Sequence, residues 1–374
     1  MFDAGYKKVS RLLDSSVAAP GNQLVYPQRD YSGEFAFQYS GMEKHFIYTG
    51  VQFSYEDNLK NTSTVNGNTA ILISDSNNSH ATGFYLYDRW QVTNQFKVEG
   101  GLRVDQNSLL SEHARKYSGR FAIAHESPRE NHTWITKLIA NRAVRFPVPI
   151  AALNEAWGID KPDASPGLRR SANADKPEIL TTIEWQNILY INNTRLSANL
   201  YYQDLIDFIS WNGPHTNVGD FSGTGLELEL QHAFSKKLTL WANTSLIDSE
   251  LKVSSTGGLT KNITSDGRIL GSPKATVTTG LDADITSHFS VYSQIRYITK
   301  QAAFDKVKAD DEDINNQVYV DQTISYAGLY NSKVSIGLTL QNILNNRDHI
   351  NLQWQQNQYK PRGRTALFDA RVSF

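Results

Sequence analysis

The feature that most constrains this chain is a strict alternation of apolar and charged residues along short segments. The segment from Gln95 to Gln106 shows it most clearly. One set of alternate positions is mainly apolar and consists of Phe96, Val98, Gly100, Leu102 and Val104. The set between them is mainly charged and consists of Lys97, Glu99, Gly101, Arg103 and Asp105. Since successive side chains of a β-strand point to opposite faces of a sheet, this pattern predicts a strand with one apolar and one charged face.

Similar alternation recurs over most of the chain, with more polar partners than a soluble core could bury. The apolar rows include Leu196 to Tyr202, Leu226 to Leu230, Leu238 to Leu246, Ala275 to Ala283 and Val334 to Leu340. The rows opposite them carry carboxylates such as Glu227 and Glu229, which are tolerable only beside water. At mid-depth in a bilayer, a charged side chain turned to lipid would cost about 2–4 kcal/mol. The sequence therefore predicts an all-β fold, a transmembrane antiparallel up-and-down β-barrel with lipid outside and water inside.

Composition excludes several other classes. No uncharged apolar run approaches the roughly 18 residues that a spanning helix requires. The chain has no cysteine, which excludes a disulfide framework and a thiolate metal site. Its formal net charge of -1 gives no electrostatic footprint for nucleic acid. The 18 Tyr, 16 Phe and 7 Trp could serve as aromatic girdles at the two membrane interfaces.

The connections between the predicted strands alternate in length. Short ones, such as Thr93 to Gln95 and Ile191 to Asn193, are rich in turn-forming residues, and long polar ones such as Pro147 to Lys176 lie between them. Short periplasmic turns and long outer loops are typical of bacterial barrels. About fifteen strands are predicted, at 31–41, 44–56, 82–93, 95–106, 116–128, 132–145, 178–190, 194–211, 221–233, 237–251, 271–285, 288–300, 315–328, 331–343 and 363–374. Residues 5–13, followed by a loop over 14–30, would add a sixteenth.

Several segments, in their order along the chain, resemble those of a known family. They are GFYLYDRWQVTNQFKVEGGLRVD at 83–105, HESPR at 125–129, NRAVRFPVP at 141–149, KPEILTTIEWQN followed by SANLYYQDLIDFISW, and then GTGLELEL, LTLQNILNNRD and KPRGRTALFDARVSF. Over roughly residues 31–374 the chain resembles the C-terminal β-barrel portion of a TonB-dependent outer-membrane receptor. This resemblance implies a bacterial outer-membrane protein with about 15–16 of a probable 22 strands.

The resemblance also implies a function and partners. It implies a receptor barrel, not an enzyme and without a cofactor, for the TonB-dependent uptake of a scarce nutrient such as a ferric siderophore. The family's plug domain, TonB box and signal peptide are missing, so the chain is expected to be a fragment that meets the TonB system only through a missing N-terminal part. Residues 1–30 would be the remnant of a preceding strand and outer loop, and 31–374 the barrel. Phe374, Val372 and Phe368 would be recognised by the barrel-assembly machinery, and outer-membrane lipid would surround the barrel.

Ligand binding is the chemistry that the residues favour. Loop-borne or loop-adjacent groups able to stack on, or pair with, an anionic aromatic metal chelate are Trp157, Arg169, Arg170, Trp211, His215, Trp354 and Tyr359. The nine histidines show no paired metal-ligand spacing such as HExxH. Glu227, Glu229 and Asp282 fall in the rows expected to face the water-filled lumen, so no catalytic role is assigned to them.

Two other function classes stay open at this point. One is a passive 16-stranded porin-like channel, which would conduct ions in a planar bilayer. The other is a soluble all-β carbohydrate-binding or adhesive protein, which would refold and stay in solution without detergent.

Overall fold

The computed structural model describes residues 2–14, 23–58, 61–65, 68–73, 77–108, 115–147, 176–211, 215–253, 264, 268–305, 310–329, 333–347, 350–351, 358–359 and 361–372. Sixteen strands of this part of the chain form one antiparallel meander in which each strand pairs with the next. They are β1 (Phe2–Asp14), β2 (Gln23–Tyr39), β3 (His45–Asn58), β6 (Asn77–Gln91), β7 (Phe96–Asn107), β8 (Arg115–Pro128), β9 (His132–Arg145), β10 (Glu178–Ile191), β11 (Thr194–Trp211), β12 (His215–Ser235), β13 (Leu238–Val253), β14 (Ala275–Asp284), β15 (Phe289–Ile298), β18 (Gln317–Leu329), β19 (Val334–Gln341) and β22 (Thr365–Val372).

Three small hairpins interrupt the numbering because they lie within the long connections. They are β4 (Asn61–Val65) with β5 (Asn68–Ile73), β16 (Gln301–Asp305) with β17 (Asp310–Ile314), and β20 (Ile350–Asn351) with β21 (Gln358–Tyr359). β4 also pairs with the start of β2, so the first hairpin joins the meander in one 18-stranded sheet. Within the described ranges, no helix is long and apolar enough to cross a membrane.

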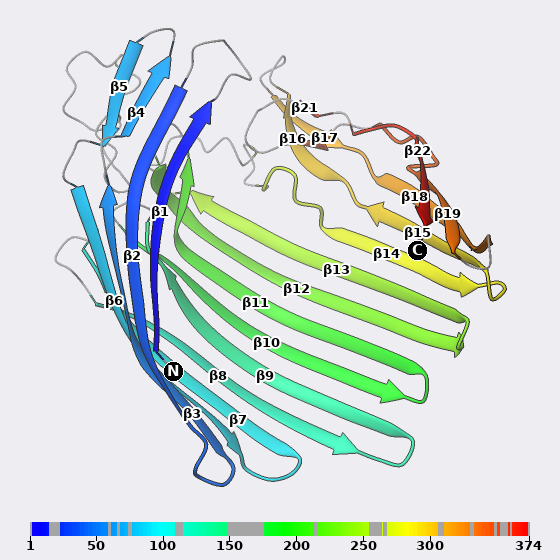
Figure 1. Ribbon diagram of the computed structural model, residues 1–374, viewed down its shortest axis with the longest axis horizontal. Coiled ribbons are helices and arrows are strands. Elements are labelled where there is room, and N and C mark those ends of the chain that lie inside the picture. Colours follow the sequence, from blue (N-terminus) through cyan, green and yellow to red (C-terminus); the bar gives the residue numbers. More distant parts are fainter. Residues whose placement is uncertain are drawn as a thin grey trace.

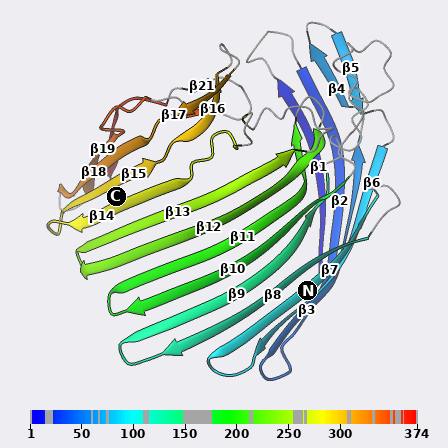
Figure 2. The ribbon, with the colours of Figure 1, turned by 180° about the vertical axis from the view of Figure 1, so that it is seen from behind.

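The sheet curls into an incomplete barrel. In Figure 1, β1 and β22 stand on opposite sides of an opening, and the strands between them wrap around a hollow. Seen from behind, β8 to β13 form a continuous ladder of long, tilted strands (Figure 2). No pairing joins β1 to β22 among the residues that the structure describes. The predicted all-β, antiparallel up-and-down architecture is confirmed.

The two faces of the sheet follow the alternation in the sequence. Leu200, Leu226 and Leu246 are register partners on β11, β12 and β13; Leu200 and Leu246 are exposed on the outer face, and Leu226 between them is half-buried. The neighbouring row, Asn199, Glu227 and Ser245, faces the hollow. Because the side-chain period of a strand is two, this register gives every apolar row of these strands the same outward phase.

On the inner face, large aromatic rings lie over cross-strand glycines. Tyr201 is the register partner of Gly225, and Trp241 that of Gly280. A Cβ atom added at Gly225 would lie 2.2 Å from the Tyr201 ring, and one at Gly280 would lie 2.3 Å from the Trp241 ring. Glycine at these positions therefore lets the rings lie flat along the wall instead of crossing the lumen.

Some strands are longer than the sequence predicts. β2 begins at Gln23 instead of Tyr31, and β12 begins at His215 instead of Phe221. β12 alone has 21 residues, and at roughly 3.3 Å per residue it exceeds an apolar band of about 25 Å even when tilted by about 40°. Backbone pairing thus continues beyond the apolar band, where water surrounds both faces and alternation is no longer required.

Candidate functional site

The adjoining ends of β11 and β12 carry two of the residues predicted to meet a ligand. Trp211 ends β11 and His215 begins β12, and the two are register partners. Tyr359 lies in β21 opposite Ile350 of β20. For these predicted residues the structure describes the backbone only. Trp157, Arg169, Arg170 and Trp354 lie outside the described residues. The structure therefore brings Trp211 and His215 together, and the contacts of the seven side chains stay a prediction.

Near this end of β11 the backbone departs from regular pairing. The register between β11 and β12 shifts between Leu205 and Phe208 and again between Phe208 and Ile209. Asp207, within the shift, has a φ of 56°, a left-handed conformation that aspartate tolerates better than most residues. Its amide nitrogen donates a hydrogen bond to Oδ1 of Asp220 over 2.9 Å. The resulting β-bulge turns the end of β11 away from the straight path of the strand.

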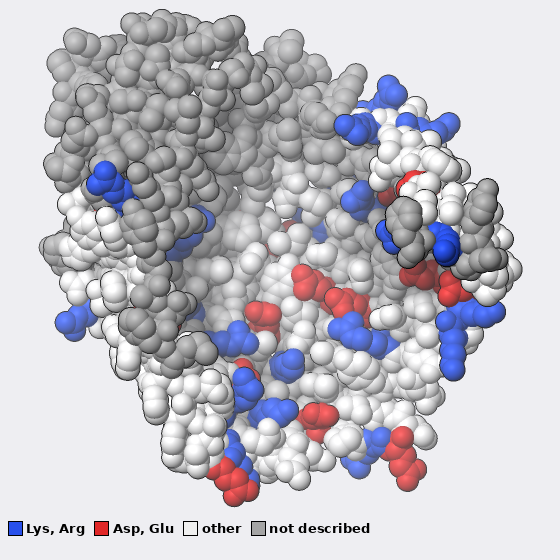
Figure 3. Space-filling model, viewed as in Figure 1, with Lys and Arg blue, Asp and Glu red and all other residues white. Residues whose placement is uncertain are grey.

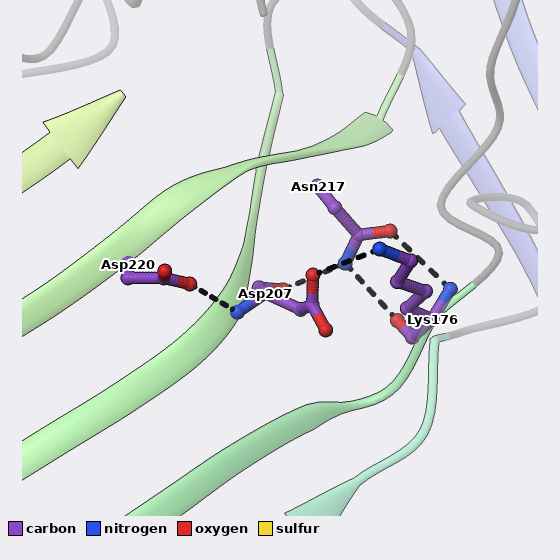
Figure 4. A network of polar contacts seen from close by, with 4 residues as sticks. All are labelled: Lys176, Asp207, Asn217 and Asp220. Carbon is purple, nitrogen blue, oxygen red and sulfur yellow. Dashed lines mark hydrogen bonds and ion pairs between the residues drawn. The ribbon is translucent and has the colours of Figure 1, made fainter. Parts of the chain in front are cut away.

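Asn217 connects this bulge to the segment before β10 (Figure 4). Its side-chain Nδ2 donates to the carbonyl oxygen of Asp207 over 2.6 Å and to that of Lys176 over 3.1 Å. Its Oδ1 accepts a hydrogen bond from the Lys176 amide over 3.3 Å. The Lys176 ammonium lies 3.5 Å from Oδ1 of Asp207, a solvent-exposed pair that contributes little by itself. The asparagine therefore does the main positioning in this cluster.

Glu178 connects the same region to β9. Its side chain is only 3% exposed, and it forms an ion pair with Arg145, its register partner on β9. The other carboxylate oxygen, Oε1, accepts a hydrogen bond from the Ile209 amide over 2.7 Å. A buried carboxylate needs such partners, because leaving a charge unpaired away from water is strongly unfavourable. Glu178 thus holds the ends of β9, β10 and β11 together.

We call the residues Arg145, Lys176, Glu178, Asp207, Asn217 and Asp220 the rim cluster. Two of its members present cationic groups to solvent, because the side chains of Arg145 and Lys176 are 69% and 62% exposed. Both cations are already paired, Arg145 with Glu178 and Lys176 with Asp207, and with Asp220 the cluster has one more carboxylate than cations, so what it offers beside the strand ends that carry Trp211 and His215 is exposed hydrogen-bond donors, not net positive charge.

Sequence reasoning did not identify the rim cluster. The only signal was the position of Lys176 and Glu178 at the end of a long polar connection, just before a predicted strand. The contacts themselves depend on a backbone shift and a left-handed residue, which residue alternation does not encode.

The concave wall below the rim is lined by charges of both signs, as Figure 3 shows. Arg103 binds Asp105 through Nε at 2.8 Å and also donates to Oε1 of Gln52 over 3.0 Å. On the neighbouring part of the wall, Arg195 pairs with Glu229 over 2.6 Å. The first pair lies within β7 and the second joins β11 to β12, and in each the charges neutralise one another, so the wall is strongly polar without a single dominant charge.

A second charged group lies on the β16–β17 hairpin. Asp313 accepts hydrogen bonds from Lys300 and Arg268, each over 2.7 Å. Because Lys300 and Arg268 stabilise its charged form, the pKa of Asp313 is held below its ordinary value. No group of three or more His, Asp or Glu side chains suited to a metal ion occurs in the part of the chain that the structure describes.

The residues predicted as a barrel-assembly signal lie on β22. Phe368 is the register partner of Leu338 and is 71% exposed, and Val372 is the partner of Val334 and is 53% exposed. Both belong to the outer apolar row. Phe374 lies outside the described residues, and recognition by an assembly machinery stays a prediction.

Comparison with known proteins gives a family match. The family model described as "TonB dependent receptor-like, beta-barrel" matches residues 4–343. No curated protein matches the chain.

Solved structures share the fold at low sequence identity. The FrpB iron transporter from Neisseria meningitidis is 15% identical, with a TM-score of 0.69 over 94% of this chain and 56% of that one. The ferric-catecholate import receptor Fiu from E. coli K12 is 15% identical, with a TM-score of 0.67 over 94% and 55%. The ferric yersiniabactin uptake receptor FyuA from Yersinia pestis is 13% identical, with a TM-score of 0.64 over 98% and 57%. The chain thus spans little more than half the length of these proteins.

Proposed function

Because the chain belongs to the family of TonB dependent receptor-like β-barrels, we propose that it forms the barrel part of a receptor that takes up a ferric siderophore. The family is one of bacterial outer-membrane transporters and not of enzymes. The observation that carries the proposal is the pairing of Trp211 with His215 at adjoining strand ends, beside which the rim cluster exposes the donor groups of Arg145 and Lys176. The printed names of similar structures, an iron transporter and ferric-chelate receptors, agree with this ligand class.

In the proposed mode of binding, the chelate rests on the outer rim. Its anionic groups pair with the loop residues Arg169 and Arg170, and the exposed donors of Arg145 and Lys176, which are already paired with Glu178 and Asp207, add hydrogen bonds. Its aromatic or unsaturated groups stack on Trp157, Trp211, Trp354 and Tyr359, and His215 donates a hydrogen bond. The iron belongs to the chelate as cargo, so the protein needs no metal ligands of its own.

Transport requires more than this barrel wall. We propose that the TonB system acts through an N-terminal part of the receptor that precedes the barrel, and that residues 31–374 form the barrel while 1–30 supply a preceding strand and outer loop. Outer-membrane lipid and the barrel-assembly machinery are the other proposed partners. The polar inner wall, with paired charges such as Arg195 and Glu229, suits the passage of a hydrated, charged cargo.

The test is a binding titration with the protein purified in detergent from outer membranes. Quenching of tryptophan fluorescence by ferric enterobactin and by a ferric hydroxamate would report binding. We expect saturable binding of a ferric chelate, and at least a tenfold weaker affinity when Arg169 and Arg170 are both replaced by alanine. That loss corresponds to about 1.4 kcal/mol for each factor of ten.

The control is Lys252→Ala, which removes an exposed rim cation whose side chain is 71% exposed and only loosely paired with Glu250. It should leave the affinity unchanged within twofold. Equal losses in both variants would mean that rim charge acts non-specifically, against the proposed site. Steady ion conductance in a planar bilayer without binding of any ferric chelate would favour a passive channel instead.

A further inference from the structure

A groove of about 640 Å³ crosses the outer face of the sheet over β9 to β13. Its floor contains the small side chains Ala198 on β11 and Ala242 on β13. Its walls include the larger side chains Trp134, Trp185 and Leu228, which are between 41% and 52% exposed. The groove exists because small residues occupy a few positions of an otherwise bulky apolar row.

The groove faces the bilayer. Ala198 is the register partner of Leu228, and Ala242 that of Leu230, so both alanines belong to the outward row. In a member of an outer-membrane family, this face is in contact with lipid. The occupant of the groove therefore has to come from the membrane. Because the groove is continuous with the lipid-facing surface, a lipid chain is the favoured occupant.

Polar groups at one end of the groove indicate which part of a lipid lies there. The Trp134 indole nitrogen donates to Oδ1 of Asn187 over 3.2 Å, and the Trp185 indole nitrogen donates to Oγ1 of Thr136 over 3.2 Å. The indole groups are thus satisfied within the protein. The Asn187 amide nitrogen, in contrast, donates to no acceptor within the described residues.

An unpaired amide donor is unfavourable in lipid, so we expect the side-chain nitrogen of Asn187 to donate a hydrogen bond to an acceptor outside the protein. Asn187 lies five residues before Asn192, the first residue of the short β10–β11 turn. At roughly 3.3 Å per residue and a tilt of about 40°, it stands roughly 12 Å from the periplasmic end of the strand. The outward row nearest the turn is largely polar, with His132, Thr194 and His232, so the apolar band begins above it and Asn187 lies only two rows farther in. The nearest acceptors that a phospholipid offers there are its ester carbonyl oxygens.

We propose that this groove binds one phospholipid of the periplasmic leaflet. One acyl chain lies over Ala198 and Ala242 between the two tryptophans, and an ester carbonyl oxygen accepts a hydrogen bond from Nδ2 of Asn187. This inference concerns the lipid-facing surface and goes beyond the proposed uptake function, which could fail without affecting it.

Native mass spectrometry of the protein purified from outer membranes tests the proposal, with palmitoyl-oleoyl phosphatidylethanolamine added as the probe. The unmodified protein should retain one tightly held phospholipid after mild detergent washing. Ala242→Phe, which fills the groove, and Asn187→Leu, which removes the donor together with the acceptor of the Trp134 indole, should each reduce that occupancy at least fivefold. The matched control is Ala140→Phe, an exposed alanine of β9 opposite Phe121 and Ile183 that does not line the groove, and it should retain the lipid.

Three results would overturn the proposal. The first is unchanged lipid occupancy in Asn187→Leu, a variant that places an apolar side chain against lipid and should fold even if Ala242→Phe does not. The second is an equal loss of lipid in Ala140→Phe. The third is a dimer whose population falls in Ala242→Phe, because the groove would then be an interface between two copies of the chain. Heat-modifiable migration on gels checks that each variant is folded.

Discussion

Gly219 is the residue on which the outer part of β12 depends most directly. Its φ of 152° is a conformation that side-chain-bearing residues rarely adopt, and a Cβ atom there would lie 2.0 Å from the carbonyl oxygen of Lys252. We expect Gly219→Ala to destabilise the protein by at least about 1 kcal/mol and to open the outer end of the β12–β13 ladder. Hydrogen exchange of the amides in 215–222 should rise.

The control for that substitution is Gly100→Ala. Gly100 lies on β7, and no described atom is within 4 Å of the position that its Cβ would take. Similar exchange rates in the two alanine variants would show that the contact with Lys252 does not constrain β12.

Glu178 makes the most demanding contacts of the rim cluster. Replacement by glutamine keeps an acceptor for the Ile209 amide but removes the charge that pairs with Arg145. We expect Glu178→Gln to lower the free energy of unfolding by about 1–3 kcal/mol, because a hydrogen-bonded pair with a buried charge is lost. Denaturant titration of the detergent-solubilised protein would measure it. Glu250→Gln is the matched surface change, since Glu250 is 63% exposed, and it should shift the free energy by less than about 0.5 kcal/mol.

Sequence patterns identified the faces of individual residues much better than their partners. That Glu227 and Glu229 face the hollow follows from alternation alone, and the structure agrees. The burial of Glu178 does not follow from alternation, because it arises where a bulge on β11 brings the Ile209 amide to a carboxylate on β10. The alternation within one strand shows which face of the sheet each side chain occupies. A contact such as that of Glu178 with Ile209 also depends on how the neighbouring strands are aligned, which the alternation does not show.

At the scale of single strands, the outward phase of β12 can be tested directly. Leu228 lies on the outer face and is 41% exposed, and Gln231 lies on the inner face three residues later. We expect Leu228→Arg to reduce the free energy of folding into phospholipid vesicles by about 2–4 kcal/mol, because a cation would face the acyl chains. Gln231→Arg should have little effect, since its side chain faces water. Urea unfolding followed by tryptophan fluorescence gives both values, and equal effects would contradict a lipid-facing Leu228.

The β16–β17 hairpin should respond to acid. Since the pKa of Asp313 lies below the ordinary value of about 3.9, its ion pairs stabilise the hairpin above that pH. The stabilisation is lost as the pH falls through the lowered pKa, when the carboxylate is protonated. We expect the exchange protection of amides in 301–314, corrected for intrinsic rates, to fall in that acidic range.

Two variants separate this effect from general acid unfolding. Asp313→Asn should lose the protection at neutral pH and show no further acid step in the hairpin. Asp284→Asn, at an exposed position beside a short turn, should behave like the unmodified protein. Protection of 301–314 that is the same in all three proteins at neutral pH would show that the contacts with Lys300 and Arg268 do not hold the hairpin.

The sequence predicted elements well where alternation was required and poorly where it was not. Strands such as β7 and β9 were placed within one or two residues, because lipid on one side and water on the other impose the period of two. The first six residues of β12, 215–220, and the hairpins β4–β5 and β16–β17 were interpreted as loops. These segments pair through their backbones in water, so polar residues on both faces carry no penalty.

At the scale of the whole molecule, the curvature of the sheet and the closure of the barrel have different causes. The curl of the sheet follows from sixteen tilted antiparallel strands with a consistent outward apolar row, all of which the sequence could indicate. Closure depends on whether the edge strands find partners. Within the described residues, β1 pairs only with β2, and β22 only with β19. The inner wall is therefore complete from β2 to β19, while both edge strands retain unpaired backbone groups on one side.

Unpaired edges predict association when residues 1–374 are produced by themselves. Each edge presents a row of amide and carbonyl groups that can pair with another chain, and lipid offers them no hydrogen bonds. We expect a mixture of oligomers in detergent, measured by size-exclusion chromatography with light scattering. Because the chain has no cysteine, single cysteines can locate the contact. Ala370→Cys on edge strand β22 should give disulfide-linked dimers, whereas Val98→Cys, on a strand paired on both sides, should not. A monodisperse monomer would mean that the edges are satisfied within one chain, and equal cross-linking of both variants would place the contact elsewhere on the outer face.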